Sequence, residues 1–329
     1  MYKIFLLFFV SSNCLAQPGY PTIGAVERYD SSINAIISTN ATAEVIATGF
    51  DWSEGPLWIE KYKMLLFSDV PRNTIYKWTA KKGTQIYLKP SGYTGSKKRG
   101  GETGSNGLLL DNKGRLVLCQ HGDRRMARML APLSSPRAKF LTLSNNWQGK
   151  KLNSPNDAVY NSKGVLFFTD PPYGLEKGMN DSSKDIPFQG VYAVSAGGET
   201  VLLTDSLTRP NGIAFLPGEK QFLVANSDGA KPTWYIFDVD ARNKVTNGRI
   251  FYDATGYDKS WRGGMDGLKV DKAGNIFATG PGGIWIFKSS GKLLGKLRLT
   301  EPASNCALSA DEKTLYITNN KQVLRFKMR

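Results

Sequence analysis

Histidine and cysteine are scarce in this sequence. The 329 residues include one histidine, His121, and three cysteines. No Cys/His cluster has the spacing of a structural zinc site, which excludes a zinc-stabilised fold. Cys119 and Cys306 lie in different sequence repeats, so we expect two buried free thiols that pack as small apolar residues. A disulfide between them is the alternative in an oxidising compartment.

Long hydrophobic runs and long amphipathic helical patterns are also missing. The apolar run at residues 4–10 is too short to cross a bilayer, and no later segment is long enough. This run follows a short basic start and precedes Cys14-Leu-Ala16, where small residues occupy the positions that signal peptidase reads. We therefore expect residues 1–16 to be a signal peptide cleaved near Ala16, and the mature protein to be exported to the periplasm or secreted.

Acidic residues are too few to balance the basic ones, and the formal net charge is +15. Such a charge raises the hypothesis of nucleic-acid binding. The basic residues are scattered, however, with short clusters at 97–99 and 124–125, and no helix-turn-helix pattern or aromatic single-strand platform is present. A solvated basic surface that favours anionic sugars or envelope polymers is the better interpretation, with no specific nucleic-acid partner. We expect a monomer or a weak oligomer.

What the sequence does contain is a pattern repeated six times. In one full cycle, Asn156 precedes a short strand at 158–160, a tight turn follows, and a second strand at 165–169 ends at Asp170. The opening positions of the six repeats are Glu54, Asn106, Asn156, Asn211, Asp266 and Asn305. They are spaced by roughly fifty residues, which is the period of a propeller blade built from short strands.

The repeats predict an all-β fold, a six-bladed β-propeller with four-stranded blades over residues 43–329. The last repeat has room for only three strands, so we expect its missing outer strand to come from residues 43–48. Pairing of the N- and C-terminal strands would then close the ring and remove an exposed sheet edge. Residues 17–42 are expected to form a lead-in segment that wraps around the outside.

This architecture would bring the opening positions together. The first strand of each propeller blade lines the central channel, so the residues that open these strands meet at one mouth. Here they are one Glu, one Asp and four Asn, and hard oxygen donors of low net charge suit Ca²⁺ or a similar divalent cation. The alternative is that the Asn-Gly and Asp-Gly pairs only form turns. Asp170 and Tyr173 should return to the same mouth, although Asp170 could instead cap its Pro-Pro turn.

Several segments carry a resemblance to a known family. They are Glu54-Gly-Pro-Leu-Trp58 with Phe67-Ser-Asp69, Ser105-Asn-Gly107 with Gln120-His-Gly-Asp-Arg-Arg125, Asn156-Asp157 with Thr169-Asp-Pro-Pro-Tyr-Gly174, Arg209-Pro-Asn-Gly212, and Asp266-Gly-Leu-Lys-Val-Asp271. The chain resembles the gluconolactonase-type lactonases that group with senescence marker protein (regucalcin). It looks nearer to the bacterial gluconolactonase branch than to the animal members, so calcium-homeostasis roles are not carried over.

The resemblance implies one divalent cation in the channel mouth, held by Glu54, Asn211 and Asp266. It also implies that Asn156 binds the metal or the substrate and that Asn106 lines the pocket. Ca²⁺ is the expected ion, and Mg²⁺, Mn²⁺ or Zn²⁺ are alternatives.

The function expected on this basis is hydrolysis of a sugar lactone such as gluconolactone. The cation would polarise the lactone carbonyl, and a metal-associated water would be the nucleophile. Asp266 and His121 are the two candidates for the general base, with substrate binding or orientation as a further role for His121. Asn106, Asn156, Asp170 and Tyr173 are expected to contact the substrate.

Three alternatives remain open at this level. The same site could serve a broader esterase or phosphotriesterase. A non-catalytic propeller could bind a sugar or an envelope partner and keep the cation for structure only. The arginine pair at 124–125 could hold an acidic sugar or belong to a solvated loop.

Overall fold

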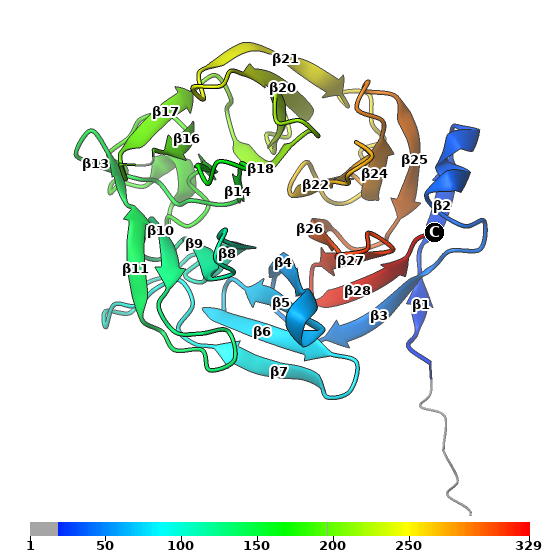
Figure 1. Cartoon of the computed structure of the whole chain (residues 1–329), viewed down its shortest axis with the longest axis horizontal. Helices are drawn as coiled ribbons and strands as arrows, with labels where there is room; N and C mark the ends of the chain where they lie inside the picture. Colours follow the sequence, from blue (N-terminus) through cyan, green and yellow to red (C-terminus); the bar gives the residue numbers. More distant parts are fainter. Residues whose placement is uncertain (1–18, 196) are drawn as a thin grey trace, which may run out of the picture.

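Six antiparallel β-sheets surround a central channel, with their innermost strands closest to its axis (Figure 1). This computed structural model describes residues 19–195 and 197–329, so the expected signal peptide at 1–16 lies outside the described residues. The predicted all-β, six-bladed propeller is confirmed. Within the described part of the chain, no helix is long and apolar enough to span a bilayer.

Each blade runs from its inner strand to its outer strand in sequence order. The first blade contains β4 (Ser53–Ile59), β5 (Met64–Asp69), β6 (Thr74–Thr79) and β7 (Gly83–Leu88). The second contains β8 (Ser105–Leu110), β9 (Leu116–Gln120), β10 (Arg125–Met129) and β11 (Phe140–Ser144). The third contains β14 (Ala158–Tyr160), β15 (Leu166–Asp170), β16 (Gly190–Val194) and β17 (Thr200–Thr204).

The fourth and fifth blades follow the same order, whereas the sixth takes its outer strand from the N-terminal part of the chain. The fourth contains β18 (Pro210–Phe215), β19 (Gln221–Asn226), β20 (Thr233–Val239) and β21 (Val245–Asp253). The fifth contains β22 (Leu268–Val270), β23 (Ile276–Gly280), β24 (Gly283–Phe287) and β25 (Leu293–Arg298). The sixth contains β26 (Ala303–Leu308), β27 (Thr314–Asn319), β28 (Gln322–Lys327) and β3 (Ala43–Thr48).

Ring closure is made by strands from the two ends of the chain. Strand β3 pairs antiparallel with β28, with Ala47 opposite Val323 and Ala43 opposite Phe326, as predicted. The lead-in segment adds two short strands outside this ring. Strand β1 (Thr22–Ile23) pairs with β3 and β2 (Ala25–Arg28) pairs with β25, so the fifth and sixth sheets have five strands.

The hydrophobic core consists of six clusters, one in each interface between adjacent blades. The two faces of a strand serve different interfaces because successive side chains alternate. On β15, for example, Phe168 packs toward the second blade, whereas its neighbour Phe167 packs toward the fourth. Cys119 and Cys306 are free and buried within these clusters.

The inner strands approach one another closely where they begin. The Gly107 amide donates to Asn156 O at 2.8 Å, and the Gly212 amide donates to Asp266 O at 3.1 Å. A Cβ at Gly107 would lie 2.8 Å from Asn156 O, and one at Gly212 would lie 2.4 Å from Asp266 O. Neither glycine has a positive φ. These Asn-Gly pairs therefore mark contacts between blades, and the turn interpretation of them was wrong.

We expect Gly212→Ala to lower the free energy of unfolding by about 1–3 kcal/mol, because the added methyl group must push two blades apart. Chemical denaturation measures this change. Gly256→Ala is the matched control, since its Cβ would meet no atom within 4 Å. An equal loss of stability in both variants would contradict the close-packing interpretation.

Candidate functional site

A cavity of about 270 Å³ opens at the mouth where the inner strands begin. Five of the six opening positions line it, namely Glu54, Asn106, Asn156, Asn211 and Asp266. The other lining residues come from nearby loops and are Trp52, Glu102, Tyr173, Ser227, Gly264 and Met265. The structure thus brings together every residue that the sequence predicted as a metal ligand.

Backbone irregularities and hydroxyl groups position these side chains. The first blade has a register shift between Glu54 and Leu57, and β8 and β18 have equivalent shifts at their openings. Such bulges turn a side chain away from the regular sheet face. Hydroxyls on second strands then hold the backbone of the next blade: Ser68 donates to Asn106 O at 2.9 Å, and Thr169 donates to Asn211 O at 2.7 Å.

Three side-chain amide oxygens in this cavity have no hydrogen-bond partner. They are Oδ1 of Asn106, Asn156 and Asn211, and these residues are only 3 %, 3 % and 4 % exposed. A buried, unpaired polar oxygen is unfavourable, and such atoms point to a ligand-binding position. Amide oxygens beside carboxylates are the donors that Ca²⁺ prefers, so the residues present fit a hard divalent cation.

Negative charge is concentrated around the same cavity. Burial raises the pKa of Glu54 to about 8, with a smaller contribution from the neighbouring charges of Asp157 and Glu102. Desolvation also raises the pKa of Asp266 well above its ordinary value, with Glu54 as the largest charged contributor. Among the described residues, no three His, Cys, Asp or Glu side chains could hold a metal together. A cation here would therefore depend on the asparagines as well as on the two carboxylates.

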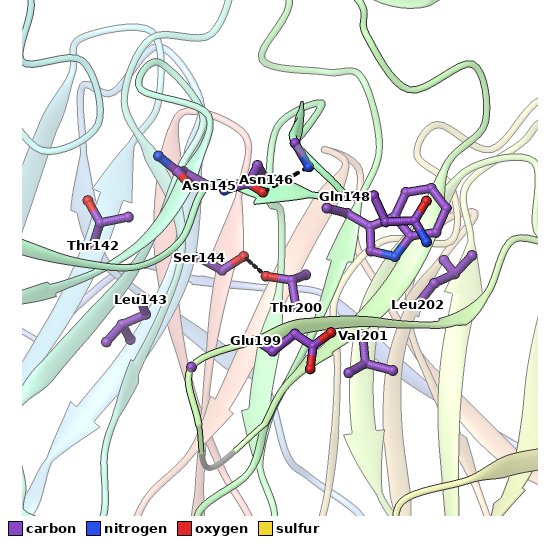
Figure 2. Close-up of a pocket in the computed structure, with 13 residues that line it drawn as sticks. Thr142, Leu143, Ser144, Asn145, Asn146, Gln148, Glu199, Thr200, Val201 and Leu202 are labelled. Carbon is purple, nitrogen blue, oxygen red and sulfur yellow. Dashed lines mark hydrogen bonds between the residues drawn. The ribbon is translucent and has the colours of Figure 1, made fainter.

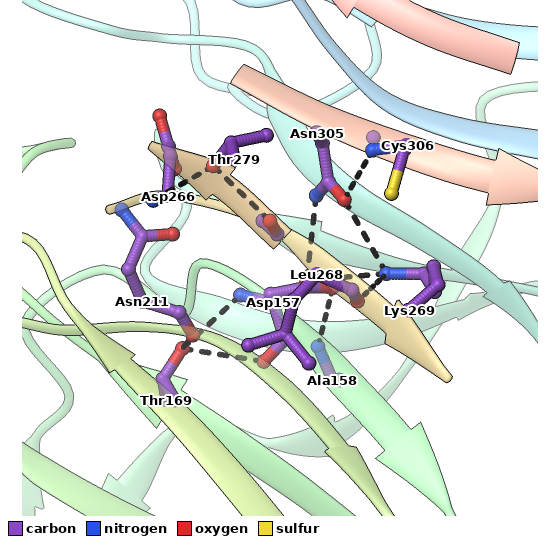
Figure 3. A network of polar contacts seen from close by, with 12 residues as sticks. Asp157, Ala158, Thr169, Asn211, Asp266, Leu268, Lys269, Thr279, Asn305 and Cys306 are labelled. Atoms are coloured by element: carbon purple, nitrogen blue, oxygen red, sulfur yellow. Dashed lines mark hydrogen bonds and ion pairs between the residues drawn. The ribbon is translucent and has the colours of Figure 1, made fainter. Parts of the chain in front are cut away.

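Beneath this cavity, a polar network crosses the channel (Figure 3). Asp157 Oδ2 lies 3.5 Å from Lys269 Nζ and accepts from Asn305 Nδ2 at 3.3 Å. Asn305 Oδ1 accepts from the Cys306 amide at 2.8 Å. Asn305, the sixth opening position, therefore belongs to this network and not to the cavity lining.

His121 lies behind the cavity wall. Its side chain is fully buried, packs against Gly174 and does not line the cavity. Nδ1 is 3.1 Å from Oε2 of Glu102, yet the pair lies outside hydrogen-bond geometry and neither ring nitrogen has a partner. His121 therefore does not line the cavity, and its catalytic and substrate-binding roles stay predictions.

Asp170 also fails to reach the cavity. It is fully buried, and its two oxygens accept from the backbone amides of Asn153 and Ser154 at 2.7 Å each. Burial raises the pKa of Asp170 to about 7, against the opposing effect of these two amides. These hydrogen bonds indicate that Asp170 holds the loop before Asn156. They do not support the substrate contact that was expected for it.

Tyr173 reaches the cavity, as expected, and its hydroxyl contacts the hydroxyl of Ser227. Sequence reasoning missed Glu102, Trp52 and Ser227. Glu102 precedes the inner strand of the second blade by three residues, in a glycine-rich loop with no repeat signal. Only the folding of this loop over the channel mouth brings its carboxylate to the site.

A larger hollow of about 720 Å³ lies at the rim, between the outer strands β11 and β17 (Figure 2). Across it, Ser144 Oγ and Thr200 Oγ1 are 2.6 Å apart. Glu199 is the single ionisable side chain among its described lining residues. The rim hollow therefore lacks the groups that hydrolysis or cation binding requires.

The fold and site define a six-bladed propeller with a cavity of carboxylates and amide oxygens at one channel mouth. A family model described as the SMP-30/Gluconolactonase/LRE-like region matches residues 52–321. The chain belongs to this family, and it is a lactonase-type enzyme.

Individual relatives agree with this assignment. The chain is 36 % identical over 310 residues to a gluconolactonase of Zymomonas mobilis, covering 92 % of this chain and 86 % of the relative. A gluconolactonase structure from Xanthomonas campestris superposes with a TM-score of 0.80 at 26 % identity, covering 95 % of this chain and 99 % of that one. A calcium-binding regucalcin from Agrobacterium tumefaciens, at 15 % identity, shares the fold with a TM-score of 0.64 over 85 % of this chain and 92 % of its own.

The raised pKa of Glu54 predicts a pH-dependent stability. Its pKa is about 8 in the folded protein against an ordinary 4.5, so folding favours the protonated form. In EDTA, the contribution of Glu54 to the melting temperature should therefore be largest below pH 4.5. This contribution should be lost as the pH rises toward 8.

Added Ca²⁺ should raise the melting temperature most at pH 8, where the carboxylate is ionised. Glu54→Gln should flatten this pH dependence, whereas Glu199→Gln should leave it unchanged. A melting temperature of the parent protein that rises between pH 5 and 8 in EDTA, with no difference in Glu54→Gln, would contradict the assignment.

Proposed function

We propose that this protein is an exported, divalent-cation-dependent hydrolase that opens a sugar lactone such as gluconolactone. The observation that carries the proposal is the set of three unpaired amide oxygens that share one cavity with Glu54 and Asp266. The gluconolactonase relatives support the lactone as substrate class. The apolar run at 4–10 and the small residues before Gln17 support export.

Glu54, Asn211 and Asp266 would hold the cation, and Asn156 would be shared between cation and substrate. When bound, the cation would polarise the lactone carbonyl and stabilise the developing oxyanion. Ca²⁺ fits best because all the donors are hard oxygens and half of them are neutral amides. Mg²⁺ and Mn²⁺ use the same donor type, whereas Zn²⁺ usually takes nitrogen and sulfur ligands.

The rest of the cavity suits a small polar ring. A volume of about 270 Å³ is at the low end for ligand sites, which favours a single sugar lactone over a larger ester. Asn106, Glu102 and the Tyr173–Ser227 pair offer partners for the ring hydroxyls. Trp52 supplies the apolar part of the wall.

Lactone opening also needs a base that takes a proton from the attacking water. Asp266 was expected in this role, but a carboxylate that binds a cation is held in its ionised form and becomes a weak base. His121 does not reach the cavity. Glu102 lines the cavity, and its side chain is 34 % exposed. It is not one of the proposed cation ligands. We therefore assign the proton transfer to Glu102, with His121 behind it as a positioning residue.

Glu54→Gln should abolish most lactone hydrolysis, because the cation loses one of its two carboxylate ligands. We expect a fall in kcat of at least about 10²-fold for gluconolactone, measured by a pH-indicator assay with Ca²⁺ present. Glu199→Gln, at the rim, should retain parental activity. Full activity of the parent protein after treatment with EDTA would refute the cation-dependent mechanism.

Glu102→Gln separates proton transfer from cation binding. We expect kcat to fall by roughly 10²- to 10⁴-fold, the usual contribution of a general base, while Ca²⁺ affinity stays within about threefold of the parent. Glu102→Asp should recover part of the activity, because it keeps a carboxylate in the cavity. If Glu102→Gln changes KM alone, Glu102 binds substrate and Asp266 regains the role of base.

A further inference from the structure

A second cavity lies on the same face as the catalytic one, beyond a shared wall. It has a volume of about 480 Å³, and four cationic residues line it: Arg99, Arg124, Lys151 and Lys177. The wall consists of the loops at 99–102 and 173–177, since Glu102 and Tyr173 line the catalytic cavity while Arg99 and Leu175 line the second one. The Gly100 amide donates to Glu176 Oε1 at 2.8 Å and joins the two loops.

Arg124 is built into the floor of this four-cation cavity. The residue is only 6 % exposed, so the interpretation of a solvated loop is wrong for it. Nε donates to Leu152 O at 2.7 Å, and Nη1 donates to Ser183 O at 2.9 Å. Nη2 is buried and has no hydrogen-bond partner. Hydrogen bonds hold this guanidinium on one side and leave one N–H donor free on the other. Such a group can donate to an oxyanion without first having to be ordered.

No direct ion pair neutralises the four cations of this cavity, although Asp185, Asp170 and Asp181 lie near enough to Arg124 to act on its pKa. Within residues 19–195 and 197–329, none of the four cations has a carboxylate within 4.0 Å, unlike Arg125, which pairs with Asp123. The acidic groups in the lining are occupied elsewhere. Glu176 accepts from the Gly100 amide, and Asp181 accepts from the amides of Lys177 and Ser183.

Burial of two of these cations disfavours their charged forms. Burial lowers the pKa of Lys151, and the neighbouring charge of Arg124 is the next cause. Burial likewise lowers the pKa of Arg124. A bound anion would offset both effects, because an opposite charge stabilises the protonated forms.

We propose that the four-cation cavity binds the carboxylate or phosphate group of a sugar acid. The assignment to a sugar acid rests on the proposed lactonase function, because the cavity adjoins the site where a lactone is opened. Two sources have this chemistry: an anionic substituent on the lactone substrate, and the aldonate that lactone hydrolysis releases.

Direct binding tests the cavity without any turnover. Isothermal titration calorimetry with sodium gluconate and with inorganic phosphate would use full-length mature protein in EDTA, which prevents gluconate from binding through a metal. We expect both anions to bind and the neutral analogue gluconamide not to bind. Lys151→Gln and Lys177→Gln should each weaken gluconate binding by roughly tenfold, as expected for loss of one charge-assisted contact.

Lys150→Gln is the matched control. Lys150 and Lys151 form the short strand β13 (Lys150–Lys151) and both are exposed, but only Lys151 lines the cavity. Lys150→Gln should leave gluconate affinity unchanged. The proposal is overturned if neither anion binds, or if Lys150→Gln weakens binding as much as Lys151→Gln, because overall charge would then explain the effect.

Kinetics distinguish the two sources. If the substrate carries the anion, Lys151→Gln should raise KM for a phosphorylated sugar lactone and leave KM for neutral gluconolactone unchanged. If the anion is the product, the variant should weaken inhibition by gluconate. A variant that changes neither quantity would overturn the link to lactone chemistry. Absence of lactone hydrolysis with intact gluconate binding would instead refute the proposed hydrolase alone.

Discussion

The site of this protein depends on how closely the inner strands of neighbouring blades approach one another at one mouth of the channel. The Gly107 and Gly212 amides bond to the backbone oxygens of Asn156 and Asp266, residues of the following blades. No side chain fits between these strands, so glycine follows a site residue at both positions. Each contact fixes the backbone that carries the next cavity-lining side chain. The ring therefore sets the distances between the residues that line the cavity. Closure of the ring by pairing of β3 with β28 keeps those distances fixed.

This rigid mouth concentrates groups that are unfavourable in isolation. Glu54, Glu102 and Asp266 face one cavity, and three asparagines turn unpaired amide oxygens toward it. A protein tolerates such a cluster when a ligand supplies the missing partner, because buried charge and unpaired oxygen are both costly. The four-cation cavity on the other side of the wall has the opposite sign. Two neighbouring hollows of opposite charge can orient a substrate that has a polarised carbonyl at one end and an anion at the other.

Much of this arrangement could be predicted from the sequence. The spacing of the six opening positions predicted six blades, and the short last repeat predicted that residues 43–48 would complete the final sheet. The oxygen-bearing residue at each inner strand predicted that these side chains would meet at one mouth, since the first strand of a blade must face the channel; five of the six line one cavity there. These inferences succeeded because strand length and repeat register are local properties that a regular propeller converts directly into position.

Other features could not be predicted from the sequence because they depend on contacts between distant segments. Asp170 returns to the mouth as its hairpin requires, but two backbone amides of the preceding loop hold its carboxylate below the surface. Asn305 shares the register of the other opening residues, yet its side chain bonds to Asp157 and Lys269 in the network beneath them. Glu102 and Arg124 belong to loops without any repeat pattern, so only loop packing reveals that Glu102 lines the cavity at the channel mouth and that Arg124 is buried.

The sequence by itself determined the propeller, its closure and the oxygen donors at the channel mouth, because these follow from period and side-chain chemistry. Only the tertiary structure decided which of those donors face open space, which are satisfied internally, and where the irregular loops place their charges. The physical reason is that the repeat sets each residue's height along the channel, whereas desolvation and hydrogen bonding to neighbouring blades decide whether its side chain remains available.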